Sequence, residues 1–197
     1  MSQPLPDAAL DQLFRAARTA NGYIDKPVST DQLHAIWELM KMGPTSANML
    51  PARLVWCVSD EAKARLAACA LPKNGEKILA APVSVVIGMD VNFHEQLPWL
   101  FPHDQTAQHW FPDPAAREVH ALRNSSLQGA YLILAARALG LDTGPMSGFS
   151  NDAVDAAFFA ETPNVKSNFI STLGYGDPAT IFGRSPRPEF DRFNRLA

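Results

Sequence analysis

The sequence predicts a single domain in which amphipathic helices pack on a few buried strands. With 197 residues, 47% of them apolar, the chain is long enough for one sizeable core and too short for a second full domain. Apolar residues recur at helical spacing in several segments, and two short runs combine β-favouring residues with few polar interruptions. These runs have the pattern of buried strands. We therefore expect one domain that spans residues 1–197.

Residues 7–43 are predicted to contain two helices. Apolar side chains follow Asp7 at helical spacing, so the first helix begins there and ends near Asn21-Gly22. Ser29 and Gln32 have the spacing of a capping box, which predicts a second helix that ends at Gly43-Pro44. The apolar positions are Leu10, Leu13, Phe14 and Ala17 in the first helix and Leu33, Ile36, Trp37 and Met40 in the second.

Strand and helix patterns alternate over residues 53–89. Residues 53–58 and 81–89 are predicted to be buried strands, because valine, isoleucine and leucine are frequent there. Residues 60–70 and 75–80 have helical patterns.

Residues 91–114 differ from the rest, because five aromatic side chains alternate there with four prolines. We interpret this segment as a lid or an insertion. Its aromatic residues form either a small hydrophobic core of their own or a cover over a flat ligand. Three histidines in it lie nine and six residues apart, a spacing that fixes no metal geometry. Since neither cysteine adds a metal-ligand pattern, no metal site is predicted.

The longest helix is predicted after this segment. Asp113-Pro114 is typical of a helix start, and the helical pattern continues to Gly140. A short strand then ends at Pro145, followed by a helix over 151–159 and a strand over 166–174. The last twenty residues, 178–197, contain three prolines and predict an extended C-terminal arm. The long helix carries a polar patch that is solvent-facing, a buried polar seam or a ligand contact: Arg123, Asn124, Ser125, Ser126 and Gln128.

Composition and missing motifs exclude several classes of function. A net charge of −3 offers no basic field for nucleic acid. The N-terminus lacks a signal-peptide pattern, and Pro82 and Ser84 interrupt the most apolar run, so no export or membrane span is predicted. Together with only two cysteines, these features predict a cytoplasmic protein. The motifs of a Rossmann dinucleotide site, a P-loop and a hydrolase nucleophile elbow are also missing.

Two loops concentrate groups that can bind a polar ring. Residues 43–48, Gly-Pro-Thr-Ser-Ala-Asn, combine hydroxyl, amide and turn-forming groups between a helix and a strand. Ordinary turn chemistry explains the same residues. Residues 142–149 carry two glycines, which let a ligand approach the backbone and a free N–H point at a ring nitrogen. The alternative is a simple glycine-rich connection.

Several cationic side chains are candidates for phosphate or ring contacts. Arg18-Thr19 in the first helix and Arg184 and Arg187 in the arm can hold a phosphate together, because guanidinium groups match phosphate oxygens bidentately. Asn74 and Lys77 lie three residues apart, so they share a helical face and can share a ligand. Each residue alone is equally typical of a solvated surface.

Taken in order along the chain, these motifs resemble the nitroreductase family. The match spans nearly the whole sequence and is more specific than any single motif. The two loops are similar to one branch of the family, which reduces malonic semialdehyde to 3-hydroxypropionate in bacterial pyrimidine utilisation. The matching elements are Arg18-Thr19, Pro44-Thr45-Ser46-Ala47-Asn48, Asn74 with Lys77, Pro145 to Phe149, Leu173-Gly174-Tyr175-Gly176, and the pair Arg184 and Arg187.

The resemblance implies an α+β fold in which helices flank a central mixed or antiparallel sheet. It also implies an intertwined homodimer whose interface holds two FMN molecules, each bound by both subunits. Ser46 and Asn48 would contact the flavin of the partner subunit, and Gly148 would present its backbone N–H to flavin N5. The implied cofactor-binding residues are Arg18, Thr19, Asn21, Pro44, Thr45, Ser46, Asn48, Asn74, Lys77, Pro145, Met146, Ser147, Gly148, Arg184 and Arg187.

Different parts of FMN are assigned to different residues by this resemblance. Arg18 and Thr19 would hold the phosphate and ribityl chain, joined by an arginine of the arm. Asn74 and Lys77 would contact the pyrimidine edge, where a cation stabilises the charge of the reduced ring. Two positions depart from the family pattern. Asn21 replaces a frequent basic residue, which leaves more of the phosphate to the arginines. Ser147 replaces a frequent acidic residue, so the family's acceptor pocket is not carried over.

The activity implied is that of an FMN-dependent NAD(P)H oxidoreductase with ping-pong turnover. NADH or NADPH would deliver a hydride and leave, and a small-molecule acceptor, with malonic semialdehyde favoured, would follow in the same pocket. No side chain is expected to act as a catalytic acid or nucleophile. The alternatives are a nitroaromatic or quinone reductase, a flavin-binding protein without turnover, and a non-enzymatic interaction module.

Overall fold

A computed structural model describes residues 3–197 of the chain. Its centre is a four-stranded sheet with the order β1-β2-β4-β3, in which all neighbouring strands are antiparallel. The strands are β1 (Ala52–Cys57), β2 (Val83–Asp90), β3 (Asp142–Met146) and β4 (Val165–Gly174). The α+β class is confirmed, and these four strands form an antiparallel rather than a mixed sheet.

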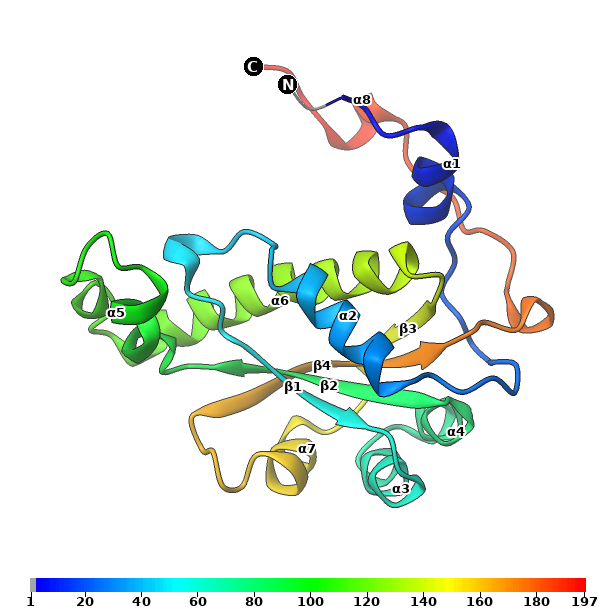
Figure 1. The fold of residues 1–197 in the computed structure, drawn as a ribbon, viewed down its shortest axis with the longest axis horizontal. Coiled ribbons are helices and arrows are strands. Elements are labelled where there is room, and N and C mark those ends of the chain that lie inside the picture. Colours follow the sequence, from blue (N-terminus) through cyan, green and yellow to red (C-terminus); the bar gives the residue numbers. More distant parts are fainter. Residues whose placement is uncertain (1–2) are drawn as a thin grey trace.

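Helices cover both faces of the sheet (Figure 1), with α2 and α6 on one face and α3, α4 and α7 on the other. The predicted capping box forms, since Ser29 and Gln32 exchange two hydrogen bonds at the start of α2. Asp113 accepts from two backbone N–H groups at the start of α6, the longest helix, as predicted. The helices are α2 (Thr30–Met40), α3 (Asp60–Ala68), α4 (Pro72–Ala80), α6 (Pro114–Ala138) and α7 (Asn151–Phe158).

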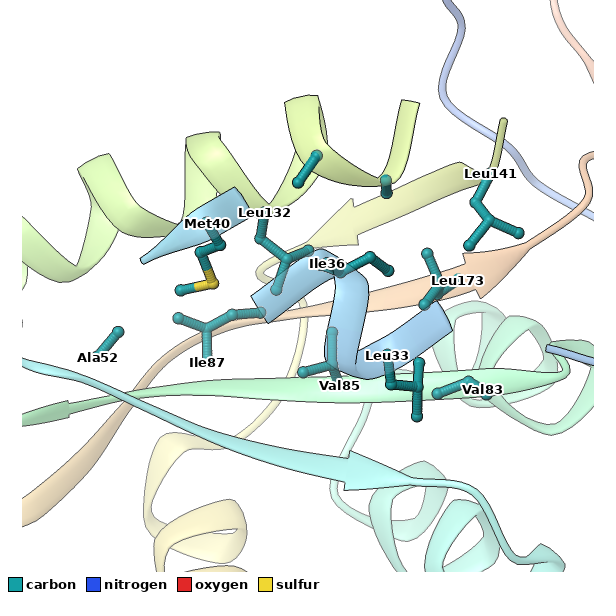
Figure 2. Close-up of a cluster of buried hydrophobic side chains, with 12 residues drawn as sticks. Leu33, Ile36, Met40, Ala52, Val83, Val85, Ile87, Leu132, Leu141 and Leu173 are labelled. Carbon is teal, nitrogen blue, oxygen red and sulfur yellow. The ribbon is translucent and has the colours of Figure 1, made fainter. Parts of the chain in front are cut away.

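Apolar clusters fix these layers to the sheet. The larger cluster lies between the sheet and the helices α2 and α6, where Leu33 and Ile36 approach Val85 and Leu132 (Figure 2). A second cluster on the opposite face joins α3, α4 and α7 to the sheet. Complete burial of one leucine or isoleucine side chain contributes about 1.5–3 kcal/mol, so a few such contacts hold each helix in place. The sheet and its two helical layers therefore form one packed core, and the loops that connect the elements are anchored to it.

The N-terminal helix is shorter than predicted. α1 (Asp7–Leu10) continues as one π-helical turn over Asp11–Arg15 and ends there, rather than near Asn21-Gly22. Thr19 then forms a parallel bridge with Thr143, and the next residue donates its N–H to the carbonyl of Thr143 at 3.0 Å. Pairing with the edge of β3 thus overrides the local helical preference.

Residues 91–113 fold into short helices at one end of the sheet. They include α5 (Leu97–Leu100) and single 3₁₀ turns over Phe93–Gln96 and Ala107–His109. Phe93 and Leu97 are fully buried in a cluster that also contains Met49. Trp99 lies outside it and is 77% exposed. The segment therefore has a small core of its own, which contacts the loop before β1.

The last residues follow β4 with little regular structure. They contain one 3₁₀ turn, Pro178–Thr180, and one short helix, α8 (Phe190–Phe193), and every residue from 183 onward is exposed. Figure 1 shows this tail running beside α1. Among residues 3–197, no helix is both long and apolar enough to cross a membrane.

Candidate functional site

A basic pocket lies between the N-terminal segment and the C-terminal tail. Its volume is about 450 Å³. Four arginines line it, together with Thr19 and Asn21: Arg18, Arg137, Arg184 and Arg187. Of the residues that the structure describes, no aspartate or glutamate lines this pocket. The predicted convergence of Arg18 with the two tail arginines is therefore present in the fold.

Backbone carbonyls, and not carboxylates, hold these arginines. The Nη2 atom of Arg184 donates to the carbonyls of Arg15 at 2.7 Å and Ala17 at 3.1 Å. Arg18 donates in the same way to the carbonyl of Phe182. Because a carbonyl is neutral, these hydrogen bonds fix the guanidinium groups without neutralising them. The pocket therefore carries uncompensated positive charge and suits an anion such as a phosphate.

Arg137 belongs to this pocket although its sequence pattern did not single it out. It lies in the last turn of α6, and its Nη1 atom donates to the carbonyl of Leu13 at 2.9 Å. Burial, with a further contribution from the charge of Arg184, lowers the pKa of Arg137, while Asp142 acts in the opposite direction. On sequence alone, Arg137 looks like an ordinary cation at a helix C-terminus. Only the approach of the N-terminal helix brings it into the pocket.

Asn21 connects the basic pocket to α4. Its Oδ1 atom accepts a hydrogen bond from Nζ of Lys77 at 2.7 Å, and its Nδ2 atom donates to the carbonyl of Thr180 at 3.3 Å. Asn21 also lines a smaller cavity of about 340 Å³, together with Lys73, Glu76 and Lys77. The amide of Asn21 therefore stands between two neighbouring hollows that both contain cationic side chains.

Asn74 connects α4 to the loop after β3. Its Nδ2 atom donates to the carbonyl of Gly148 at 3.0 Å, and the N–H of Leu71 donates to the same carbonyl at 2.9 Å. Within residues 3–197, the N–H of Gly148 itself has no hydrogen-bond partner. A Cβ atom at this position would lie 2.5 Å from Nδ2 of Asn74 and 3.0 Å from Cδ1 of Leu71, so a larger residue would displace these side chains. This loop therefore offers a free backbone donor beside Asn74.

The remaining predicted residues of that loop lie at its exposed side. Pro145 and Met146 end β3, where they pair with Ser171 and Ile170 of β4. Pro145 and Ser147 are exposed, while Met146 packs against the second cluster. One chain thus brings together Arg18, Thr19, Asn21, Asn74, Lys77, Pro145, Met146, Ser147, Gly148, Arg184 and Arg187 along the outer edge of β3.

The other predicted loop lies elsewhere. The backbone N–H of Ser46 donates to Oδ1 of Asn124 at 2.8 Å, near the middle of α6. Arg137 of the basic pocket lies thirteen residues further along the same helix, which is about 20 Å at 1.5 Å per residue. In Figure 1 the loop lies toward α5, and α4 lies at the other end of the sheet. Pro44, Thr45, Ser46 and Asn48 are therefore separate from the basic pocket of their own chain.

The polar patch predicted on α6 is in large part a buried seam. Asn124, Ser125 and Gln128 are almost completely buried, whereas Arg123 and Ser126 are exposed. No group of three or more histidine, cysteine or acidic side chains is placed to hold a metal ion in the part of the chain that the structure describes. Cys57 and Cys69 are free thiols.

Comparison with known proteins identifies the relatives of this chain. The model of the nitroreductase family matches residues 1–175. A protein of Stenotrophomonas maltophilia with the provisional name NADH dehydrogenase/NAD(P)H nitroreductase is 58% identical over 198 residues, which cover both chains completely.

Solved structures share the fold at lower identity. A nitroreductase-like protein of Bacillus subtilis has a TM-score of 0.85 and 19% identity, covering 98% of this chain and all of the other. A protein of Exiguobacterium sibiricum, solved in complex with FMN, has a TM-score of 0.82 and 22% identity, and each chain covers the other completely.

Proposed function

This chain belongs to the nitroreductase family, and we propose that it is an FMN-dependent NAD(P)H oxidoreductase that reduces a small aldehyde acid such as malonic semialdehyde. The observation that carries the flavin assignment is the continuous line of groups along the edge of β3. Uncompensated arginines at one end are joined through Asn21 and Lys77 to a free N–H at Gly148.

The residues of this line fit the chemical parts of FMN. The phosphate carries about two negative charges near neutral pH, and the basic pocket supplies guanidinium groups with no carboxylate among its described lining residues. The ring of a flavin is flat and polar at one edge, where Asn74 and Lys77 of α4 are available. Gly148 supplies a backbone donor that no other group of the described chain occupies. The cradle beside Asn74 would be filled by any side chain at position 148.

FMN supplies the hydride chemistry at its ring nitrogen N5 when it is bound. The side chains of this protein bind and orient. Arg18, Arg137 and Arg184 hold the phosphate end, and Thr19 contributes a hydroxyl beside it. Lys77 would supply a positive charge to the ring, where reduction adds negative charge, and the N–H of Gly148 would be a hydrogen-bond donor to the ring. The ring would thus lie beside the edge of the sheet, and the phosphate between the N-terminal segment and the tail.

A homodimer completes the site in this proposal. Ser46 and Asn48 are exposed. The loop that carries them contacts the middle of α6, about 20 Å along that helix from Arg137, so it does not face the line of groups at β3 of its own chain. They contact the flavin of the partner subunit instead. Exposed apolar side chains support an interface on the outer face of α2 and α6, because such surfaces mark sites of association. They are Trp37 and Leu39 of α2, Met42 just after α2, and Leu122, Leu127 and Tyr131 of α6.

The acceptor is assigned on the similarity of two loops, residues 44–48 and 142–149, to the branch that reduces malonic semialdehyde. The carboxylate of such an acceptor requires a cation, and the smaller cavity beside Asn21 offers Lys73 and Lys77 against one acidic residue, Glu76. We place this reaction in the cytoplasm, where NAD(P)H is available and the free thiols of Cys57 and Cys69 stay reduced.

A nitroaromatic or quinone reductase is the second candidate. A cavity of about 620 Å³ lies beside the 44–50 loop, lined by Trp37, Met42 and Trp99. Aromatic and apolar walls of this kind suit flat acceptors. A comparison of kcat/KM for malonic semialdehyde and for a nitroaromatic compound separates the two activities. A clear preference for the nitroaromatic compound would reject the aldehyde acid.

Anaerobic mixing tests the proposed function as a whole. The purified protein should be yellow, NADH should bleach the flavin absorbance, and the acceptor should restore it. A colourless protein that takes up no FMN contradicts the flavin assignment. A yellow protein that NADH does not bleach is a flavin-binding protein without turnover.

A further inference from the structure

The 44–50 loop has an unfavourable backbone conformation. Ala47, Asn48 and Leu50 have φ angles of 48°, 50° and 37°, in the left-handed region that side chains other than glycine seldom adopt. Each such residue costs about 1–3 kcal/mol. A loop with this much strain keeps one conformation only where its surroundings enforce it. Contacts from outside the loop must therefore hold it.

Two buried amides on α6 supply these contacts. The N–H of Ser46 donates to Oδ1 of Asn124, and the N–H of Ala52 donates to Oε1 of Gln128, both at 2.8 Å. Asn124 and Gln128 are four residues apart, so they lie one above the other on α6. They bind the chain on either side of the strained residues. Their side chains thus fix both ends of the loop.

Both amides of α6 are buried polar groups. Asn124 is 2% exposed and Gln128 is fully buried. In the described chain, the buried Nε2 atom of Gln128 has no hydrogen-bond partner. An unpartnered buried amide destabilises a fold by about 1–3 kcal/mol. Both amides are thus buried beside the loop whose backbone is strained, and each accepts a hydrogen bond from the chain next to it.

The strained loop presents its polar groups outward. Met49 is completely buried and anchors the loop in the third apolar cluster, whereas Ser46 and Asn48, which precede it, are exposed. Nδ2 of Asn48 also donates to the carbonyl of Leu100 at 2.8 Å, which fixes that side chain. Ser46 is thus held through its backbone and Asn48 through its side chain, and both residues are exposed.

We infer that Asn124 and Gln128 are positioning residues for the flavin of the partner subunit. They hold the 44–50 loop in the conformation in which Ser46 and Asn48 contact the ring and ribityl chain of that flavin. The inference rests on the proposed function, and it adds a route by which α6 of one subunit determines cofactor binding in the other.

Affinity for two flavins tests the positioning role. Asn124→Leu and, separately, Gln128→Met remove the acceptor atoms with little change in volume. Each should weaken binding of FMN and riboflavin by the same factor, about ten-fold, since a hydrogen bond of about 1.4 kcal/mol is one decade in affinity and the loop does not meet the phosphate. Flavin fluorescence quenching gives both dissociation constants. Unchanged affinity in both variants overturns the inference.

Asn168→Ala is the matched control. Nδ2 of Asn168 donates to the hydroxyls of Ser125 and Ser126, at 2.8 and 2.9 Å, so its loss also removes two hydrogen bonds to α6. It touches no part of the 44–50 loop. If this variant lowers flavin affinity as much as Asn124→Leu does, the effect arises from a general loosening of α6 and the positioning role is wrong. Two variants on α6 are used so that the test stands if one of them does not fold.

Hybrid dimers test whether the effect reaches the other subunit. One subunit carries Asn124→Leu and its partner carries Arg18→Ala, and differently tagged chains allow the hybrid to be purified. If the loop acts on the partner's flavin, one site contains both changes and the other contains neither. The hybrid should then bind one FMN per dimer with wild-type affinity. A hybrid without any wild-type site shows that the loop acts within its own subunit. A wild-type protein that binds no flavin would instead reject the proposed function.

Discussion

Nζ of Lys77 lies 2.7 Å from Oδ1 of Asn21, so a cation of α4 is held by a neutral amide at the border of the basic pocket. An amide orients the ammonium group and leaves its charge uncompensated. The positive charge of Lys77 therefore remains available to a ligand.

Replacement of Lys77 should affect flavin reduction more than flavin binding. Lys77→Ala removes a charge that is needed most when negative charge develops on the ring, so the rate of reduction by NADH should fall about ten-fold or more, while FMN affinity changes less. Anaerobic stopped-flow absorbance measures the rate. Lys77→Arg, which keeps the charge, is the control. Equal rates in Lys77→Ala and the wild type would remove Lys77 from the site.

The arginines of the basic pocket should distinguish FMN from riboflavin. Arg18→Ala, or Arg184→Ala combined with Arg187→Ala, should weaken FMN binding by about ten- to a hundred-fold and leave riboflavin binding nearly unchanged. This range corresponds to about 1.5–3 kcal/mol for a charge-assisted hydrogen bond. Fluorescence quenching gives both dissociation constants. Arg15→Ala is the control, because Arg15 is paired with Asp7 and Asp11 outside the pocket. Equal losses for both flavins would assign the pocket arginines to the fold.

Glycine at position 148 should be required because of Asn74. In Gly148→Ala the new Cβ atom would meet Nδ2 of Asn74 at 2.5 Å, so either the loop after β3 or the Asn74 amide must shift, and FMN affinity should fall about ten-fold because both contact the flavin in the proposal. The double variant Asn74→Ala with Gly148→Ala removes the clashing amide. Because Asn74 also contacts the flavin in the proposal, the double variant is compared with Asn74→Ala, and Gly148→Ala should cost less affinity in that background than in the wild type. If it costs the same factor in both, the contact with Asn74 is not what restricts position 148.

The oligomeric state should depend on the exposed apolar face of α2 and α6. Sedimentation at low micromolar concentration should show a dimer of 21.5 kDa chains. Leu127→Glu, at a position that is 47% exposed, should shift the protein toward monomer and release FMN, because part of the site comes from the partner. A monomer that still holds FMN would contradict the shared site.

Cys57 should make the protein less stable at alkaline pH. Burial raises the pKa of the Cys57 thiol to about 11, whereas an unfolded cysteine titrates near 8.5. As the pH rises between these values, the unfolded chain releases a proton that the folded chain retains, so the free energy of unfolding falls. The loss should reach about 1–2 kcal/mol at pH 10. Urea unfolding at pH 8 and pH 10 measures it. In Cys57→Ala this part of the pH dependence should be missing, and an identical pH dependence would rule out Cys57 as its source.

Local signals in the sequence predicted much of the fold. The capping box of Ser29 and Gln32 and the start of α6 at Asp113 were both predictable, because each depends on residues within one helical turn. The end of the N-terminal helix was not, because Thr19 leaves the helix to pair with Thr143, more than a hundred residues away. Local preference carries no information about that partner.

The same distinction applies to the candidate site. Arg18, Arg184 and Arg187 were found through their order along the chain, which resembles a known family. Arg137 was not found, since only the contact of α6 with the N-terminal helix brings it into the pocket. The polar patch on α6 was recognised, but its partners, the N–H groups of Ser46 and Ala52, became visible only in three dimensions.

The hydrogen bonds between arginines and backbone carbonyls that join the tail to the N-terminal segment also bear on local unfolding of the protein. The tail is exposed from residue 182 onward, and Arg18 and Arg184 tie it to the N-terminal segment, whereas β2 is buried along its whole length. Segments with few buried contacts open at low free energy, and buried strands open only on global unfolding. Backbone amides of the tail should therefore exchange with solvent deuterium long before those of β2. The walls of the basic pocket can separate while the sheet stays intact, so an anionic ligand can leave or enter without unfolding of the core.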